Sequence, residues 1–172
     1  MAAITTEAIK ELREKTGAGV MDCRRALQQA DGDVQKAIQV LHAQGLERAG
    51  NKAGRVARQG VVESFVHLGR VGAIVELNCE TDFVARDEGF RALAREVAQH
   101  IVGVGRATEF VAPEDAPADM PEEEKREKVL LLQPFIKNPG QTIQQLIIER
   151  ASRFGENVRI GRFARLEIGE ES

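Results

Sequence analysis

The sequence predicts an α+β protein in which three short N-terminal helices precede a small antiparallel sheet flanked by helices. Residues 1–45 carry apolar side chains at the spacing of a helix. From residue 71 the pattern changes to the alternation of a strand, and residues 158–168 alternate again. We therefore expect a small helical domain at residues 1–50, a basic linker at 51–59 and an α+β core domain at 60–172.

The first 45 residues are predicted to form three helices. The first spans about 6–15, with Ile9 and Leu12 on one side, and stops at Gly17, while the second spans about 21–30. The side chain of Asp33 can cap the third helix by accepting from free backbone N–H groups. One stripe of that helix then carries Val34, Ala37, Ile38 and Leu41. Gly45 is expected to end it, and three helices this short bury little surface alone.

The strands are predicted on either side of a hairpin turn. In "VGAIVELNC", side chains at every second position share one face of a strand, and "GVVESFVHL" before it is apolar on both faces. Gly69-Arg70 between them suits a two-residue turn. The last segment, "VRIGRFARLEI", is expected to place Arg159, Phe163 and Arg165 on one face and the apolar residues on the other, with Arg162 an exception.

The stretch "NCETDFVARDEGF", residues 78–90, joins the end of a strand to the start of a helix. From Phe90 a clear helical stripe follows, which continues with Leu93, Ala94, Val97 and Ile101. Phe83 lies seven residues before Phe90, so a helix that began early would put both in the core. Gly89 weakens that interpretation, because glycine costs about 1 kcal/mol in a helix interior. Periodicity alone leaves open whether Phe83 is core or a binding residue.

The remaining segments are less regular. Residues 103–121 hold three prolines and several acids and are expected to form an exposed excursion. "EEEKREK" suits a short helix, and Thr142 with Gln145 has the spacing of a capping box before another helix.

Composition excludes several classes of function. The only aromatic residues are seven Phe, so a base-stacking surface for single strands is not expected. The net charge of −3 argues against a nucleic-acid binder, although the basic segment 48–58 leaves contact with RNA as an alternative. Two distant cysteines and three scattered histidines give no disulfide framework, metal site or catalytic set, so we expect no cofactor and no enzymatic activity. Without a signal peptide or an apolar run long enough to span a bilayer, we expect a cytoplasmic protein.

Three separated motifs resemble one family. "KELREKTGAGVMDCRRAL" resembles the N-terminal signature of elongation factor Ts, "GAIVELNCETDFVARDEGF" is similar to its second signature, and "RFARLEIGE" to its C-terminal ending. This family is the guanine-nucleotide exchange factor of the GTPase elongation factor Tu. The resemblance implies a ubiquitin-associated-like three-helix domain followed by a small antiparallel sheet flanked by helices.

The resemblance also implies the partner-binding residues. In the family a Thr-Asp-Phe-Val motif wedges its Phe between two helices of the GTPase and disturbs the Mg²⁺ site, so that GDP leaves. The motif falls on Thr81, Asp82, Phe83 and Val84. Contacts near the phosphate-binding loop of the GTPase fall on Arg13, Val20, Met21 and Arg24, and a contacting lysine of the basic linker falls on Lys52. Gly50 and Asn51 stand where relatives are commonly rich in Ala and Lys.

The chain resembles the short form of the family, whose members act as homodimers. We therefore expect a homodimer that binds elongation factor Tu and neither nucleic acid nor membrane. The competing interpretation is a non-catalytic interaction module that tethers some other protein.

Overall fold

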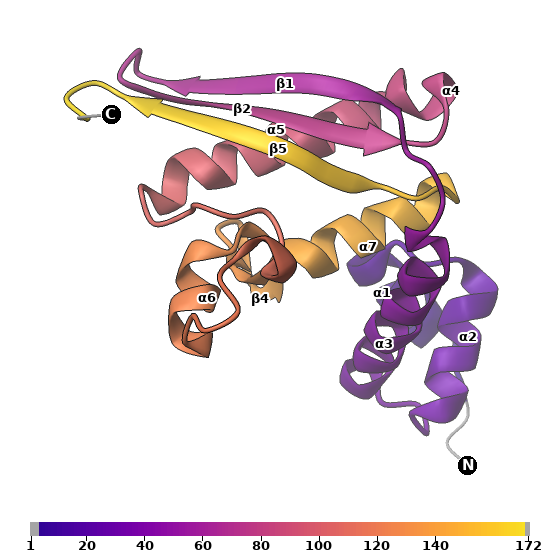
Figure 1. The fold of residues 1–172 in the computed structure, drawn as a ribbon. Helices are drawn as coiled ribbons and strands as arrows, with labels where there is room; N and C mark the ends of the chain where they lie inside the picture. The colour runs from indigo at the N-terminus through magenta and orange to yellow at the C-terminus, as the bar shows by residue number, and fades with distance from the viewer. Residues whose placement is uncertain (1–3, 171–172) are drawn as a thin grey trace. The chain divides into compact units, whose positions relative to one another are not determined.

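The computed structural model describes residues 4–170, and for residues 46–53 it describes the backbone alone. Helices, short 3-10 turns and strands follow one another along the chain, as Figure 1 shows. Their bounds are α1 (Thr6–Thr16), α2 (Val20–Gln29), α3 (Val34–Ala53), β1 (Gln59–His67), β2 (Val71–Cys79), α4 (Asp82–Ala85), α5 (Glu88–Val104), η1 (Pro113–Asp115), α6 (Glu122–Lys128), η2 (Leu130–Leu132), β3 (Pro134–Phe135), β4 (Asn138–Thr142), α7 (Ile143–Phe154) and β5 (Arg159–Glu167). The predicted α+β class is confirmed.

The chain divides into two compact units. The N-terminal unit contains Met1–Arg55 and Ile148–Asn157, and the sheet unit contains Val56–Ile147 and Val158–Ser172. The second half of α7 therefore counts with the N-terminal helices. The domain boundaries predicted at residues 50 and 59 stay a prediction.

The N-terminal unit forms around the predicted helical stripes. Its buried residues are Leu12, Cys23, Ala26, Leu27, Ala30 and Ala37, with Val34, Ile38 and Leu41 packed against them. Asp33 caps α3 as predicted, because its Oδ1 accepts from the backbone N–H of Gln35 at 2.8 Å and of Lys36 at 3.0 Å.

The expectation that Gly45 ends the third helix is wrong, because α3 continues to Ala53. A glycine inside a helix costs about 1 kcal/mol, so it persists where a side chain would not fit. At Gly45 a Cβ would lie 2.7 Å from Cγ2 of Ile148 in the second half of α7. Packing against another helix explains the glycine better than helix termination does. Residues 51–53, predicted as linker, accordingly belong to this helix.

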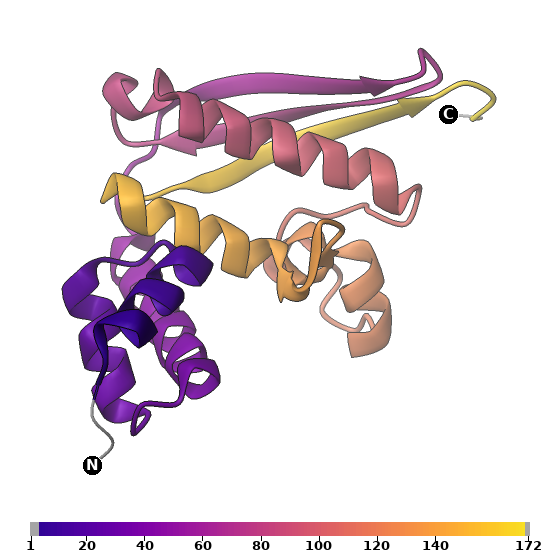
Figure 2. The ribbon, with the colours of Figure 1, turned by 180° about the vertical axis from the view of Figure 1, so that it is seen from behind.

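The sheet unit is built on three antiparallel strands in the order β1-β2-β5. Helix α5 lies across one face, as Figure 2 shows from behind. Its predicted stripe is confirmed, since every member is at most 1% exposed: Phe90, Leu93, Ala94, Val97 and Ile101. These side chains pack on the inner face of β2, which contributes Ala73, Val75, Leu77 and Cys79.

The hairpin between β1 and β2 turns one residue earlier than predicted. Leu68 (φ 51°) and Gly69 (φ 67°) are the central residues, and Arg70 N–H donates to the His67 carbonyl at 3.0 Å. Glycine accepts a positive φ at little cost, whereas leucine rarely adopts one. The prediction of Gly69-Arg70 missed this because it placed the glycine first.

A β-bulge reverses the faces predicted for β5. Glu76 pairs with Arg162 but Leu77 pairs with Ile160, so Gly161 is an extra residue. After the bulge Phe163 lies opposite the buried Val75, which puts it on the inner face, and the side chain of Arg165 is only 11% exposed. The prediction that Phe163 and Arg165 share the face of Arg159, opposite the apolar residues, is therefore wrong. The outward residues are instead Ala164 and Leu166.

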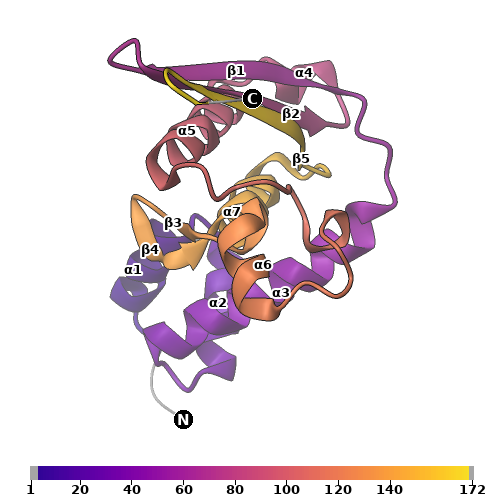
Figure 3. The same cartoon turned by 60° about the vertical axis from the view of Figure 1, so that its left-hand side comes forward.

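The segment from α5 to α7 carries short elements, which Figure 3 shows. Helix α6 follows the predicted acidic excursion, and β3 pairs with β4 in a small hairpin that the sequence analysis did not predict. The capping box before α7 is confirmed. Gln145 N–H donates to Thr142 Oγ1 at 3.2 Å, and Thr142 N–H donates to Gln145 Oε1 at 2.9 Å.

His100 of α5 is fully buried in a hydrogen-bonded network. Its Nδ1 accepts from the Ile136 backbone N–H at 3.3 Å, so the ring proton lies on Nε2, which contacts Gln133 Oε1 at 2.9 Å. Gln133 in turn donates to Thr108 Oγ1 at 2.8 Å. Burial lowers the pKa of His100, and the hydrogen bond that its ring donates to Gln133 opposes that shift only in part. The neutral imidazole thus links α5 to the segment around β3.

Replacing His100 should reduce the loss of stability in acid. The folded pKa lies below the unfolded value of about 6.5, so the unfolded state binds more protons, and stability falls as pH drops below that value. His100→Gln keeps a donor for Gln133 and cannot be protonated. We expect its melting midpoint to fall less than that of the wild type between pH 7.5 and pH 5.5, measured by scanning calorimetry. An equal fall in both proteins would contradict this assignment.

Candidate partner-binding site

The segment between β2 and α5 forms a single helical turn, α4. Thr81 precedes it in an extended conformation (φ −123°, ψ 157°), and its Oγ1 accepts from the Val84 backbone N–H at 3.5 Å. At the other end Arg86 N–H donates to the Asp82 carbonyl at 3.1 Å. A four-residue helix is unstable by itself in water, so its shape depends on what holds its ends.

Both ends of α4 are attached to buried structure. The thiol of Cys79, the fully buried last residue of β2, donates to the Thr81 carbonyl at 3.1 Å. Ala85 is 8% exposed and faces the core. Asp87 then caps α5, because its Oδ1 accepts from Gly89 N–H at 2.8 Å and Phe90 N–H at 3.2 Å. The turn is therefore fixed between a central strand and a packed helix.

Phe83 projects from this turn into solvent. Its side chain is 83% exposed, whereas Phe90 is fully buried. The break at Asp87 separates α4 from α5, so the two rings are not on one helical face. The interpretation of Phe83 as a core residue is wrong. Single exposed apolar side chains are common on protein surfaces, so the informative feature is that this ring projects from a turn held at both ends.

Charged side chains flank Phe83. Asp82 Oδ2 lies 3.0 Å from Nη2 of Arg86, and these side chains are 50% and 80% exposed. An exposed ion pair of this kind contributes at most about 1 kcal/mol to stability. Asp82 or Arg86 can therefore leave this pair and bind a group of another protein at a small cost in free energy. The sequence analysis did not single out Arg86, although four residues after Asp82 is the spacing of a helical ion pair. Thr81 is exposed and Val84 is half-buried.

The second predicted group lies in the N-terminal unit. Val20 and Met21 are 48% and 61% exposed at the start of α2, and Arg24 is exposed one turn later. Arg13 is exposed on α1. Neither side chain belongs to the buried core of the three N-terminal helices. The Lys52 side chain lies outside the described residues.

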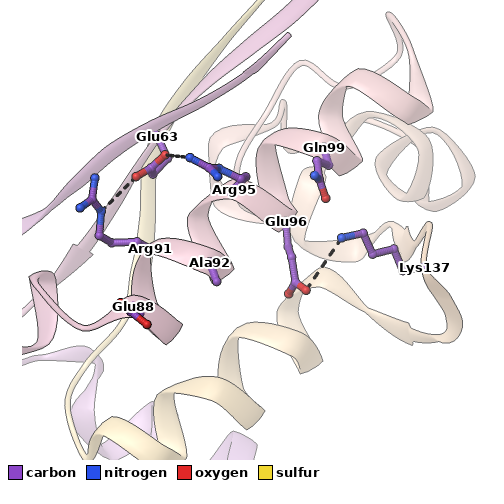
Figure 4. Close-up of a pocket in the computed structure, with 8 residues that line it drawn as sticks. All are labelled: Glu63, Glu88, Arg91, Ala92, Arg95, Glu96, Gln99 and Lys137. Atoms are coloured by element: carbon purple, nitrogen blue, oxygen red, sulfur yellow. Dashed lines mark hydrogen bonds and ion pairs between the residues drawn. The ribbon is translucent and has the colours of Figure 1, made fainter. Parts of the chain in front are cut away.

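A charged hollow also opens beside α5, with a volume of about 470 Å³. Its lining residues are Glu63, Glu88, Arg91, Ala92, Arg95, Glu96, Gln99 and Lys137, which Figure 4 shows. Arg91 and Arg95 both contact the Glu63 carboxylate, at 3.1 and 3.3 Å, while Lys137 lies 3.9 Å from Glu96. Because three cations alternate with three anions, the hollow favours neither an anion nor a cation.

Within the described residues no cluster of three or more His, Cys, Asp or Glu side chains could hold a metal ion. Among those same residues no helix has the length and apolarity needed to cross a membrane. Phe83 on α4, with Val20 and Met21 at the start of α2, is among the large apolar side chains that the described part of the chain leaves exposed to solvent.

Comparison with known proteins gives the family. A family model described as Elongation factor TS matches residues 80–170, which begin just before α4. An elongation factor Ts of Carboxydothermus hydrogenoformans is 43% identical over 197 aligned residues, which cover 97% of this chain and 90% of the relative. The chain belongs to the elongation factor Ts family. It is therefore a translation elongation factor.

The length of the chain corresponds to some family members and not to others. An elongation factor Ts of Thermodesulfovibrio yellowstonii is 40% identical, and the match covers 98% of each chain. One of Thermosynechococcus vestitus is 42% identical, but the match covers only 67% of that relative. The family thus includes elongation factors Ts with a long additional region.

Proposed function

We propose that this protein is the guanine-nucleotide exchange factor of elongation factor Tu. Phe83 enters between two helices of the GTPase domain and disturbs its Mg²⁺ site, so that GDP is released. Family membership supports the partner, and the 83% exposure of Phe83 on an anchored turn supports the wedge. The exposure of Phe83 is the observation that carries the proposal. Burial of this ring would release free energy that the free protein does not obtain, because its own core leaves the ring in solvent.

The energetics of the wedge are those of differential binding. Burying a Phe side chain yields about 1.5–3 kcal/mol, and this energy is available only when the GTPase opens a place for the ring. An exchange factor must bind the nucleotide-free GTPase more tightly than the GDP-bound form. By linkage it then weakens GDP binding by the same factor. No reaction is catalysed on a substrate of the factor itself.

The N-terminal unit adds affinity in this proposal. Val20 and Met21 are exposed apolar side chains at the start of α2, and the cations Arg24 of α2 and Arg13 of α1 are exposed as well. We assign these four residues to a contact near the phosphate-binding loop of the GTPase, and Lys52 to a separate contact of the linker. These contacts increase the affinity for the GTPase, whereas Phe83 changes the affinity for GDP.

Two other functions make different predictions. A non-catalytic module would bind its partner and leave nucleotide release unchanged. Contact with RNA through residues 48–58 would give an affinity that falls steeply with salt. A release assay with purified elongation factor Tu and fluorescent GDP separates these outcomes.

Truncation of Phe83 should strongly reduce exchange and leave the fold intact. Because the ring is exposed, we expect the melting midpoint of Phe83→Ala to stay within a few degrees of wild type. Stimulation of GDP release should fall at least about tenfold, since a buried anchor contributes about 2 kcal/mol or more. Asp82→Ala should lower exchange less, because its ion pair is weak.

Phe90→Ala is the matched stability control for this experiment. It removes the same side chain seven residues later but from the core, and should cost about 3–5 kcal/mol. Val56→Ala, which truncates another exposed apolar residue, should leave exchange unchanged. A Phe83→Ala protein that melts far earlier, yet stimulates release normally while folded, would contradict the wedge.

We further propose a homodimer formed through the outer face of the sheet. Val62, Val66, Ile74 and Leu166 are between 51% and 78% exposed there. Cross-strand pairs place them together, since Ile74 lies opposite Ala164, and Gly72 lies between Val66 and Leu166. An apolar patch of this kind marks an interaction site in a protein of this size.

A charge on this face should separate the subunits. In sedimentation at micromolar concentration the wild type should show twice the chain mass of 18.9 kDa. Ile74→Glu should sediment as a monomer, because a dimer would bury its carboxylate without a partner. Val56→Glu places the same charge on an exposed apolar residue outside the face and should remain dimeric. A wild-type monomer throughout the micromolar range would contradict the proposal.

A further inference from the structure

Residues 148–157, which comprise the second half of α7 and the residues after it, contact the N-terminal segment at three separate places. Ile148 lies against Gly45 in the middle of α3, and Arg153 lies against Gly17 between α1 and α2. The side chain of Asn157 donates to the Arg55 carbonyl, beyond the end of α3, at 2.9 Å. Residues 148–157 are therefore a fourth part of the N-terminal unit, although more than ninety residues separate them from α3 in the sequence.

The contact at Gly17 is unusually close. Gly17 ends α1 in the left-handed conformation (φ 65°, ψ 5°), and its N–H donates to the Arg13 carbonyl at 2.7 Å. The guanidinium of Arg153 occupies the place where a Cβ at residue 17 would be. Two independent reasons thus favour glycine at residue 17: its backbone has a positive φ, and a Cβ would collide with the guanidinium that covers it.

Arg153 is itself oriented by its own helix. Its Nη2 lies 3.4 Å from Glu149 Oε1, one turn earlier, and the Glu149 side chain is only 14% exposed. A planar guanidinium can lie flat on a glycine backbone, whereas a lysine ammonium cannot. The arrangement depends on the shape of the arginine side chain as well as on its charge.

The covered turn leads directly into the exposed apolar pair of α2. Gly19 caps α2 without any side-chain hydrogen bond, and Val20 and Met21 follow. Within the turn, Ala18 N–H donates to Thr16 Oγ1 at 3.3 Å and its carbonyl accepts from the Cys23 thiol at 3.7 Å. These two side-chain contacts are long, so the turn of residues 17–19 is held mainly by backbone hydrogen bonds, from Gly17 N–H to the Arg13 carbonyl at 2.7 Å and from Cys23 N–H to the Gly19 carbonyl at 2.9 Å. The side chain of Arg153, which covers Gly17, adds a constraint from outside the turn.

We propose that Arg153 is a positioning residue for the partner-binding end of α2. By covering Gly17 it holds the turn of residues 17–19 in one conformation and fixes the direction in which Val20 and Met21 project. This inference rests on the proposed function of these two residues. A pre-organised contact surface binds more tightly, because less conformational freedom is lost on association. Arg153 therefore acts on affinity and not on the wedge.

The full chain with Arg153→Ala tests this proposal in two ways. Hydrogen exchange of the backbone amides of residues 16–22 should become faster, while α5 keeps its protection. The concentration of factor that gives half-maximal GDP release from elongation factor Tu should rise about three- to tenfold. The maximal release rate should not change, because Phe83 is intact. A purely structural role would instead lower the melting midpoint and leave the half-maximal concentration unaltered.

Three further variants make the test specific. Arg126→Ala removes an exposed arginine from α6 and should change neither readout. Arg153→Lys should behave like Arg153→Ala, and a full rescue by lysine would overturn the stacking role. Gly17→Ala should raise the half-maximal concentration, but by a smaller factor in the Arg153→Ala background, since the two residues act through one contact. Equal factors in both backgrounds would overturn the proposal.

The hydrogen-exchange measurement is independent of elongation factor Tu. If the wild type failed to stimulate release, the proposed function would fall, while the effect of Arg153 on residues 16–22 could still be read. If release were normal and neither readout responded to Arg153→Ala, the positioning role alone would be wrong.

Discussion

The attachment of a four-residue helix at both of its ends is the constraint on which the site depends. A turn as short as α4 has no stability of its own, yet it must hold Phe83 away from a core that would otherwise bury it. The thiol of Cys79 and the cap at Asp87 fix its two ends. Arg91 and Arg95 tie α5 to the nearly buried Glu63 of β1, so the helix that follows the turn is also held. The sheet and α5 thus form a rigid support for one exposed ring.

The two units expose apolar side chains to solvent in a similar structural setting, Phe83 in the sheet unit and Val20 with Met21 in the N-terminal unit. In each, the exposed residues sit on or beside a short connection whose neighbours are fixed by caps, glycines or an ion pair. A rigid surface of this kind loses little entropy on binding, so more of the contact energy contributes to affinity. In the N-terminal unit the fixing group comes from a distant segment, because Arg153 covers Gly17.

Local patterns predicted much of this structure, and long-range packing explains what they missed. The α5 stripe and the capping box of Thr142 with Gln145 depend on neighbours within a few residues, so periodicity and spacing predicted them. The reversal of faces in β5 depends on the bulge at Gly161, which is set by pairing with β2. The continuation of α3 past Gly45 depends on Ile148. For Phe83 the sequence pattern left two interpretations open, and only the break at Asp87 decides between core and surface.

The central claim is that another protein buries Phe83, and fluorine NMR can observe this directly. With 4-fluorophenylalanine placed at position 83 alone, the resonance in the free protein should show the solvent isotope shift of an exposed ring. Addition of nucleotide-free elongation factor Tu should move the resonance and remove that isotope shift. The same probe at position 90 should show no solvent isotope shift, either in the free protein or in the complex. A resonance at position 83 that stays solvent-exposed in a complex that releases GDP would contradict the account.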